Sequence, residues 1–375
     1  MTSGTRKYNR LYVHIPFCSS KCDYCAFYSE ISPDKNDVDA YLTRLFEEFR
    51  ENAPSCSLLK SIYFGGGTPT YLSVAHLQKL FEKVDSSFQI APDAEISIEA
   101  NPDTLDKKKI ETIASFCNRV SVGVQTSYKN LRSIIGRKCE EYNIAGVINN
   151  ILESSVKNIS CDLIYGIPAQ TASMLLNDLH LILESGVKHI SAYSLTFEEN
   201  SILGKNKSYT ESVHSEIESE MWYMLEEELK KHGILRYEIS NYAENGYECR
   251  HNLEIWYGDT YLGCGPAAAS FDGEIRTVNP PNLINWLKKV PPEKDMISQK
   301  YRAEEIFIMG LRTVNGWNEK TFFQRTGFNF SDFKPTIKKV ENAGLIKYDT
   351  ESGIIKCTET GLACWNDTAL MVIEN

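Results

Sequence analysis

Short apolar runs alternate with amphipathic stretches through roughly the first 200 residues of the chain. The strand-like runs are Leu11–Phe17, Ser61–Phe64, Ala94–Ala100, Arg119–Gln125, Ile159–Tyr165 and His189–Phe197. The helix-like stretches between them are Val38–Arg50, Val74–Val84, Leu105–Phe116, Tyr142–Glu153 and Ser173–Ser185. Six strands in series, separated by helices, predict an α/β fold with a parallel sheet and helices packed outside it.

Polar and apolar side chains alternate within four of these runs, the first, third, fourth and fifth. In the third run Ile96 and Ile98 share one face, while Glu95, Ser97 and Glu99 share the other. A sheet buried between two helix layers is normally apolar on both faces. The pattern therefore predicts a partial (β/α)6 barrel, similar to a TIM barrel, whose inside holds a polar ligand. An edge strand with a wet face would explain one such run but hardly four.

The pattern changes after about residue 200. It predicts a long acidic helix at Ser212–His232, a strand at Tyr237–Tyr242, a glycine-rich loop at Gly258–Gly273 and a linker at Val290–Glu293. The last segment predicts helices at Ala303–Thr313, Asn318–Arg325 and Phe333–Asn342, followed by strands at Ile346–Tyr348 and Ile354–Cys357. We therefore expect a half-barrel core at 1–200, an extension at 201–295 and a winged-helix-like α+β domain at 296–375. The mixed charge of that domain favours packing or partner docking over DNA binding.

Composition narrows the classes of partner. The chain of 375 residues is 42% hydrophobic and 24% charged, which predicts an ordinary soluble core. Its net charge of -10 argues against nucleic acid as the main partner, because phosphate binding needs basic surface. No apolar stretch approaches the roughly 18 residues of a membrane span, and the start lacks the apolar core of a signal peptide. We expect a cytoplasmic protein without a transmembrane span.

The strongest local signal is the cysteine cluster Cys18, Cys22 and Cys25, directly after the first strand. Three thiolates within eight residues can hold one compact cofactor, and a four-iron cube bound by three cysteines leaves one iron open. A zinc site with His14 as fourth ligand, or three structural cysteines, are the alternatives. Spacing of three residues and then two is typical of radical S-adenosylmethionine (SAM) proteins, which the chain resembles here. In those proteins the open iron binds SAM.

Polar residues follow the other strands. Gly65, Gly66 and Gly67 directly follow the second run, and backbone without Cβ atoms can approach a ligand closely. Glu99, Gln125 and Asp162 end the third, fourth and fifth runs on the inward face, where buried acids are rare unless paired. Arg137 follows the fourth strand and would clasp the SAM carboxylate. Taken singly, each could be a helix cap, a salt bridge or a solvated side chain.

Several motifs together narrow the resemblance to the oxygen-independent coproporphyrinogen III oxidase superfamily. They are 11–18 (LYVHIPFC), 65–70 (GGGTPT), 98–103 (IEANPD), 122–125 (VGVQ), 162–168 (DLIYGIP) and 237–241 (YEISN). The likeness covers nearly the whole chain. It implies that SAM is contacted by Tyr12, Tyr24, Gly66, Gly67, Thr68, Glu99, Gln125, Arg137 and Asp162.

Two branches of that superfamily compete. The oxidases carry a fourth cysteine where this chain has Phe27, and a longer segment before the cluster. Both features make the chain resemble the branch of HemW-type haem chaperones, which is also marked by an HNxxYW motif. The matching stretch is 251–256 (HNLEIW), with Ile255 in place of the tyrosine. The resemblance implies His251 as the haem ligand and Trp256 as a surface on which the porphyrin stacks; a structural role for His251 at a turn is the alternative.

The resemblance implies a haem-binding and haem-transfer protein that uses a [4Fe–4S] cluster, SAM and haem. Its expected partners are haem or another porphyrin, a haem-acceptor protein and an electron donor such as flavodoxin or ferredoxin. Whether it is also an enzyme stays open. The enzymatic alternative is oxidative decarboxylation of coproporphyrinogen III, and a third possibility is opening of the haem ring.

Overall fold

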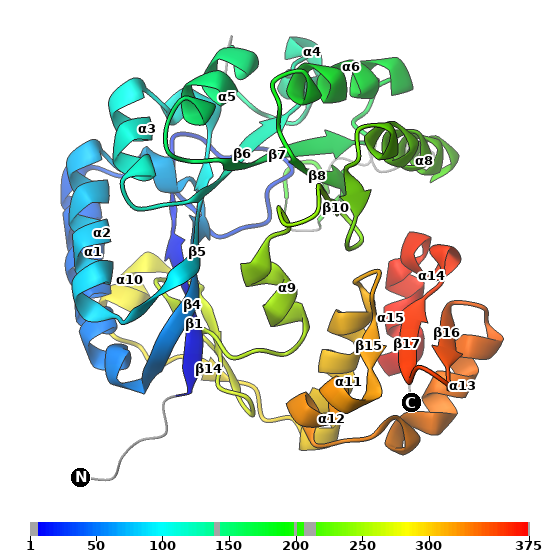
Figure 1. Cartoon of the computed structure of the whole chain (residues 1–375). Helices are drawn as coiled ribbons and strands as arrows, with labels where there is room; N and C mark the ends of the chain where they lie inside the picture. The colour runs from blue at the N-terminus through cyan, green and yellow to red at the C-terminus, as the bar shows by residue number, and fades with distance from the viewer. Residues whose placement is uncertain (1–6, 139–142, 199–200, 206–214, 374–375) are drawn as a thin grey trace, which may run out of the picture.

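The centre of the molecule is a nine-stranded sheet in the order β11-β1-β4-β5-β6-β7-β8-β10-β9 (Figure 1). The computed structural model describes residues 7–138, 143–198, 201–205 and 215–373. Six strands run parallel and follow one another in chain order: β1 (Tyr8–Ile15), β4 (Cys56–Gly66), β5 (Ile90–Ala100), β6 (Arg119–Gln125), β7 (Asn158–Tyr165) and β8 (His189–Ser194). The strand order ends at β11 and β9 without closing on itself. The predicted partial barrel is therefore confirmed.

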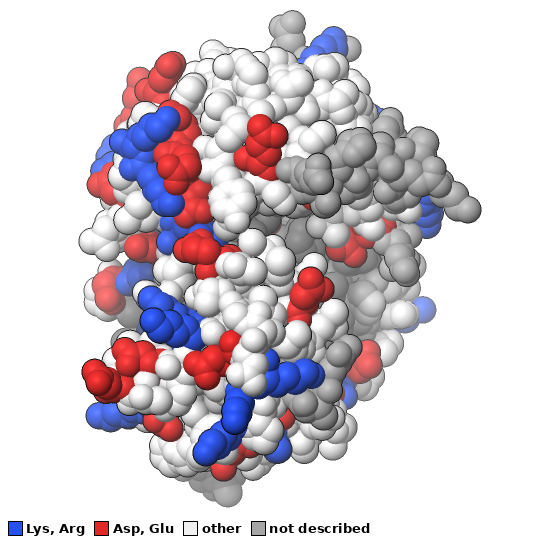
Figure 2. Space-filling model, turned by 90° about the vertical axis from the view of Figure 1, so that its right-hand side faces the viewer, with Lys and Arg blue, Asp and Glu red and all other residues white. Residues whose placement is uncertain are grey.

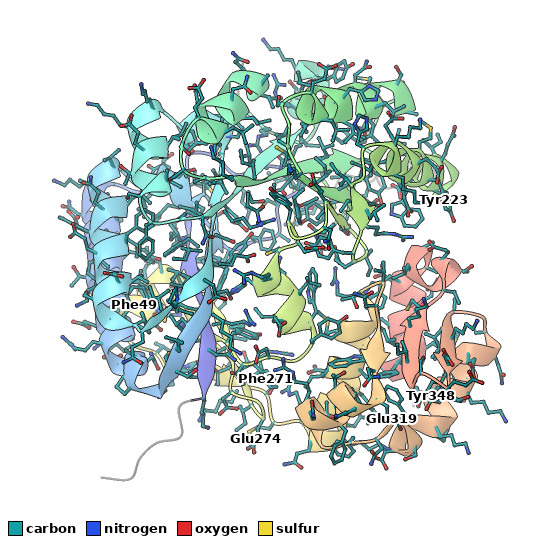
Figure 3. All side chains as sticks on the ribbon, in the orientation of Figure 1. Phe49, Tyr223, Phe271, Glu274, Glu319 and Tyr348 are labelled. Carbon is teal, nitrogen blue, oxygen red and sulfur yellow. The ribbon has the colours of Figure 1, made fainter. Side chains whose placement is uncertain are left out.

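Helices cover the outer face of this sheet (Figure 1). They are α1 (Lys35–Asn52), α2 (Val74–Ser87), α3 (Lys107–Ala114), α4 (Lys129–Ile134), α5 (Ile144–Leu152), α6 (Ala172–Leu183) and α8 (Ser215–Lys231). The predicted helix starts at Tyr142 and Ser212 lie outside the described residues. Side chains of the apolar strand face, such as Val13 and Ile98, are 0% exposed beneath the helices. Phe49 of α1 lies in this outer layer (Figure 3), with its ring 5.4 Å from that of Phe88.

The inner face of the sheet is polar and buried. Ser61, Ser97 and His189 are all 0% exposed. The hydroxyl of Ser160 lies 2.7 Å from Nδ1 of His189, and Nε2 of the same ring lies 2.9 Å from the hydroxyl of Tyr237. Buried polar groups of this kind are stable only when they are paired. The alternation seen in the sequence thus reflects a polar interior.

Two sequence predictions after residue 200 are wrong. The stretch Tyr237–Tyr242 is not one strand: β9 (Leu235–Arg236) ends before it, and only its last two residues belong to β10 (Asn241–Ala243), which pairs with β9 in an antiparallel hairpin. The carboxylate of Glu238 holds the turn by accepting from the backbone N–H of Ser240 (2.8 Å).

The glycine-rich stretch Gly258–Gly273 is not a loop throughout. It contains β11 (Leu262–Cys264), which pairs in parallel with β1, and β12 (Ala269–Phe271). Leu262 lies opposite Leu11, and both side chains are buried in the outer core. Long-range pairing with β1 therefore outweighs the local preference of glycine for turns. β12 continues into a small sheet with β13 (Arg276–Val278) and β14 (Glu293–Lys294), interrupted by α10 (Leu283–Leu287).

The C-terminal unit has the predicted helix order and its own core. Its helices are α11 (Gln299–Leu311), α12 (Glu319–Thr326), α13 (Lys334–Asn342), α14 (Glu359–Ala363) and α15 (Trp365–Ile373). Its sheet has the order β15 (Trp317–Asn318), β17 (Ile354–Cys357) and β16 (Ile346–Asp349). Trp317, Phe322 and Phe307 pack at its centre. Glu319 and Tyr348 lie side by side (Figure 3), with the hydroxyl 3.5 Å from the carboxylate. This is a winged-helix-like arrangement.

The surface carries charges of both signs. On the face shown in Figure 2, basic and acidic side chains are interspersed with uncharged ones. Within the part of the chain that the structure describes, no helix combines the length and the apolar character that crossing a bilayer requires.

Candidate functional site

The three clustered cysteines lie on a loop that follows β1. The loop is closed at its base by β2 (Phe17–Cys18) and β3 (Glu30–Ile31), which pair in parallel. The backbone N–H of Ser32 donates to the carbonyl of Cys18 (2.8 Å). Cys18, Cys22 and Cys25 are half-buried free thiols. The loop therefore presents all three sulfur atoms at the carboxyl end of the parallel strands.

Neighbouring segments hold this loop in place. The N–H of Asp23 donates to the carbonyl of Ile135 (3.0 Å), and the carbonyl of Asp23 accepts from the N–H of Leu203 (2.9 Å). A Cβ atom added to Gly67 would lie 2.9 Å from the carbonyl oxygen of Phe17 and 3.0 Å from Sγ of Cys18. This close approach requires glycine, so part of the triple-glycine motif serves to bring the end of β4 against the cysteine loop.

The arrangement suits an iron–sulfur cluster better than a zinc ion. No group of three His, Cys, Asp or Glu side chains among the described residues converges as the ligands of one metal ion. In a four-iron cube each cysteine binds a different iron, so its thiolates need not converge. His14 is occupied otherwise: Nδ1 lies 3.1 Å from the Tyr12 hydroxyl and Nε2 lies 3.1 Å from the carbonyl of Tyr28.

Burial and charge act in opposite directions on the cysteines. Burial raises the pKa of Cys22 to about 11, while the positive charge of Arg137 opposes that rise. Burial also raises the pKa of Cys18 and of Cys25. Iron binding replaces the thiol protons. Against the effect of burial, the charge of Arg137 therefore favours the thiolate form of Cys22 that a cluster needs.

Glu99 ends β5 on the inner face beside this loop. Its carboxylate accepts from the Tyr63 hydroxyl (3.0 Å) and from the backbone N–H of Gly66 (3.1 Å). Burial, followed by the negative charge of Asp162, raises the pKa of Glu99 to about 7; the two donors and Arg119 oppose that rise. Asp162 accepts from the Ser121 hydroxyl (3.2 Å), and burial raises its pKa as well. Two acids whose charge is disfavoured face the same place, which favours a cationic ligand there.

Arg137 and Gln125 form a second cluster at this end of the sheet. The guanidinium donates to Oε1 of Gln125 (2.5 Å), to the carbonyl of Gly123 (2.7 Å) and to Oδ1 of Asn101 (2.8 Å). Gln125 has a φ of 60° at the irregular end of β6, a backbone conformation that turns its side chain out of the strand pattern. Tyr24 is half-buried and lies beside the same guanidinium.

The structure thus brings the predicted SAM residues together. Gly66, Gly67, Thr68, Glu99 and Gln125 lie at strand ends or directly after them, Tyr12 and Asp162 lie within β1 and β7, and Tyr24 and Arg137 lie on the adjoining loops. Their contacts with SAM remain a prediction. Sequence reasoning missed Tyr63, which stacks on Tyr12 with ring centroids 6.2 Å apart and holds Glu99. Its signal was available, because Tyr63 has the same strand parity as Ser61 and Gly65.

His251 lies apart from that end of the sheet. It sits on α9 (Arg250–Trp256), which packs against the inner face between the sheet and the C-terminal unit (Figure 1). Its side chain is 2% exposed, and Nδ1 lies 2.8 Å from the Ser61 hydroxyl. Burial, together with Arg10 and Arg119, lowers the pKa of His251 to about 3, so the imidazole is neutral. The ring of Trp256 faces the guanidinium of Arg312 at 4.6 Å. With α9 in this position the imidazole of His251 has almost no access to solvent.

Comparisons with known proteins agree with this architecture. Residues 12–182 match the family model of the radical SAM superfamily. The solved structure of coproporphyrinogen III oxidase (HemN) from Escherichia coli superposes with a TM-score of 0.85, covering 98% of this chain and 91% of that one. At 22% identity that likeness shows the fold alone.

Sequence similarity to curated proteins shows the family to which this chain belongs. Heme chaperone HemW from Lactococcus lactis is 31% identical over 96% of both chains. Heme chaperone HemW from Bacillus subtilis is 32% identical over 92% of this chain and 93% of its own. Fold, cysteine loop and family model together define a protein of the radical SAM superfamily. Within that superfamily, the chain belongs to the HemW family.

Proposed function

We propose that this chain is a cytoplasmic haem chaperone that holds a [4Fe–4S] cluster, SAM and haem, and passes the haem to an acceptor protein. The observation that carries the proposal is the identity above 30% with heme chaperones HemW across more than nine-tenths of the chain. An electron donor such as flavodoxin or ferredoxin belongs to the proposal, because the cluster is a redox group.

Cys18, Cys22 and Cys25 would hold the cluster. When bound, it supplies redox-active iron with one position open for the amino and carboxylate groups of SAM. Arg137 would donate to the SAM carboxylate, Glu99 would contact the sulfonium or the ribose, and Asp162 would accept from the ribose hydroxyls. Tyr12, Tyr24, Gly66, Gly67, Thr68 and Gln125 complete the proposed contacts.

His251 would ligate the haem iron, as neutral imidazole commonly does. It lies in the segment 201–295, which we propose as the extension between a core at 1–200 and a C-terminal domain at 296–375. Because the imidazole is buried against Ser61, the haem-bound state that we propose has α9 displaced from the inner face of the sheet. Trp256 would then be available to stack on the porphyrin.

A haem titration tests the proposal. Visible spectra of the anaerobically reconstituted protein should show a stable haem complex, and the complex should be lost in His251→Ala. The matched control is His180→Ala, which removes a partly exposed histidine on α6 that pairs with Glu228 (3.0 Å). Coproporphyrinogen III incubated with the same protein should give no vinyl product. Turnover to protoporphyrinogen would establish the oxidase instead, and degradation of the added haem would establish ring opening.

A further inference from the structure

Helix α9 is fastened to the inside of the sheet at its first residues. The carboxylate of Glu95 on β5 accepts from the backbone N–H groups of Arg250 (2.9 Å) and His251 (3.0 Å). Glu95 is 3% exposed, so this contact lies in the polar interior. Unsatisfied N–H groups at a helix start are stabilised by such an acceptor. The start of α9 therefore has a fixed place on β5.

The imidazole of His251 lies between two residues of β4. Nδ1 meets the Ser61 hydroxyl at 2.8 Å, and the ring lies against Tyr63 with centroids 5.3 Å apart and planes tilted by 32°. Arg10 donates to the oxygen of Ser61 (2.9 Å), which leaves the hydroxyl proton of Ser61 for Nδ1. The histidine is thus held on one side and supports an aromatic ring on the other.

Tyr63, which packs against His251, in turn holds the carboxylate of Glu99. Its hydroxyl donates to one carboxylate oxygen of Glu99 at 3.0 Å, and the other oxygen accepts from the N–H of Gly66 at 3.1 Å. Tyr12 stacks on Tyr63 at 6.2 Å. The orientation of Glu99 therefore depends on a tyrosine whose ring rests partly on α9.

We propose that His251 is a positioning residue for SAM binding, because its ring holds Tyr63 and Tyr63 holds the Glu99 carboxylate. The proposal rests on the SAM site of the proposed function and is independent of haem binding. It has a consequence for haem: an imidazole that leaves the sheet to ligate iron stops supporting Tyr63. Haem and SAM then weaken each other's binding by the same factor.

Two substitutions of His251 test whether its ring holds Tyr63 in the position that SAM binding needs. SAM affinity is measured by equilibrium dialysis on the anaerobically reconstituted protein, with cluster content and melting temperature recorded for each variant. His251→Ala removes the ring and should weaken SAM binding roughly fivefold. His251→Phe keeps a ring of similar size without a ligating nitrogen, so SAM affinity should stay near that of the wild type. Unchanged affinity in His251→Ala, or equal weakening in His251→Phe, would overturn the proposal.

A second pair of variants tests the hydrogen bond from Tyr63 to Glu99 by removing a hydroxyl, which leaves the aromatic ring in place. Tyr63→Phe removes the hydroxyl that holds Glu99 and should weaken SAM binding. Tyr41→Phe is the matched control, since it also removes one buried hydroxyl, which donates to the backbone carbonyl of His14 (2.8 Å). Equal affinities in these two variants would contradict the proposal. If His251→Ala does not fold, His251→Phe and this pair decide the question.

A double-mutant cycle shows whether the effect passes through Glu99. In a Glu99→Gln background, His251→Ala should change SAM affinity much less than in the wild type. An undiminished effect would place the action of His251 elsewhere and refute the proposal. Haem titration of the same samples separates the two claims: absence of any haem complex rejects the chaperone function, whereas the SAM affinities alone decide the positioning role.

Discussion

Nη1 of Arg137 lies 2.5 Å from Oε1 of Gln125, which joins the segment after α4 to the irregular end of β6. The same guanidinium donates to the Gly123 carbonyl and to the Asn101 side chain. These three oxygens fix the plane of the guanidinium. A fixed cation beside the cysteine loop is suited to an anionic group of a ligand.

Arg137→Lys should weaken SAM binding roughly tenfold, because a lysine cannot reproduce the planar fork that holds several oxygens at once. The cluster should still form, with iron content and visible absorbance close to those of the wild type. Equilibrium dialysis against SAM measures the change. Arg276→Lys is the control, since Arg276 lies on β13 of the small sheet, where it pairs with Glu305 of α11 and is not one of the predicted SAM residues. Equal affinity in the two variants would remove Arg137 from the SAM site.

Cys22→Ala should abolish the absorbance at roughly 400 nm that iron–sulfur thiolate bonds give, since the two remaining thiolates cannot hold the cube. Iron analysis after anaerobic reconstitution gives a second measurement. Cys364→Ala is the matched control, because Cys364 is a free, exposed thiol at the end of α14. If Cys22→Ala takes up as much iron as Cys364→Ala, the cluster assignment is wrong.

The affinity for SAM should rise with pH through about 7. Burial and then Asp162 raise the pKa of Glu99 to about 7, against Tyr63, Gly66 and Arg119. Since the sulfonium of SAM is positive, it binds the carboxylate in preference to the neutral acid. As pH falls through that pKa, protonation of Glu99 removes the attraction, and affinity at pH 6 should be roughly tenfold below that at pH 8. Tyr12, Tyr193 and Cys25 also face Glu99, but Tyr12 and Tyr193 have pKa values raised by burial and stay neutral in this window.

Glu99→Gln separates this effect from the titration of SAM itself. The amide cannot ionise, so the dependence of affinity on pH that belongs to Glu99 should disappear in the variant. Any dependence that remains belongs to the ligand or to other groups. A profile that is identical in wild type and Glu99→Gln would exclude Glu99 as the group that titrates.

The sequence predicted the parallel strands and the polar interior because both are local patterns. The bounds predicted for β6, Arg119–Gln125, are those of the structure, since valines alternate with small or polar residues along that strand. The strand β11 was missed because its three residues are paired to β1, more than two hundred residues earlier in the chain. A pattern within 258–273 cannot reveal that partner.

In the candidate site, too, local patterns could be predicted from the sequence, whereas contacts between distant segments could not. Cysteine spacing and strand parity indicated the cluster loop, Glu99 and Asp162. They could not indicate that His251 lies beneath Tyr63, because this contact depends on how α9 packs against β4. The motif predicted His251 as the haem ligand, while only the packing places it 2% exposed inside the sheet.

Asp259→Asn should lower the free energy of unfolding by about 2–4 kcal/mol, because it leaves a buried arginine without its main counter-ion. Asp259 is 5% exposed and joins the sheet to the C-terminal unit: one oxygen accepts from Nε of Arg10 (3.1 Å), and the other accepts from Nη1 of Arg325 on α12 (2.8 Å). Arg10 is 4% exposed and has little water to replace that partner. The matched change Asp272→Asn breaks a surface pair with Lys7 and should cost less than about 1 kcal/mol. Urea unfolding, followed by tryptophan fluorescence, measures both. Equal losses in the two variants would mean that the link between the sheet and the C-terminal unit contributes no more to stability than an ordinary surface ion pair.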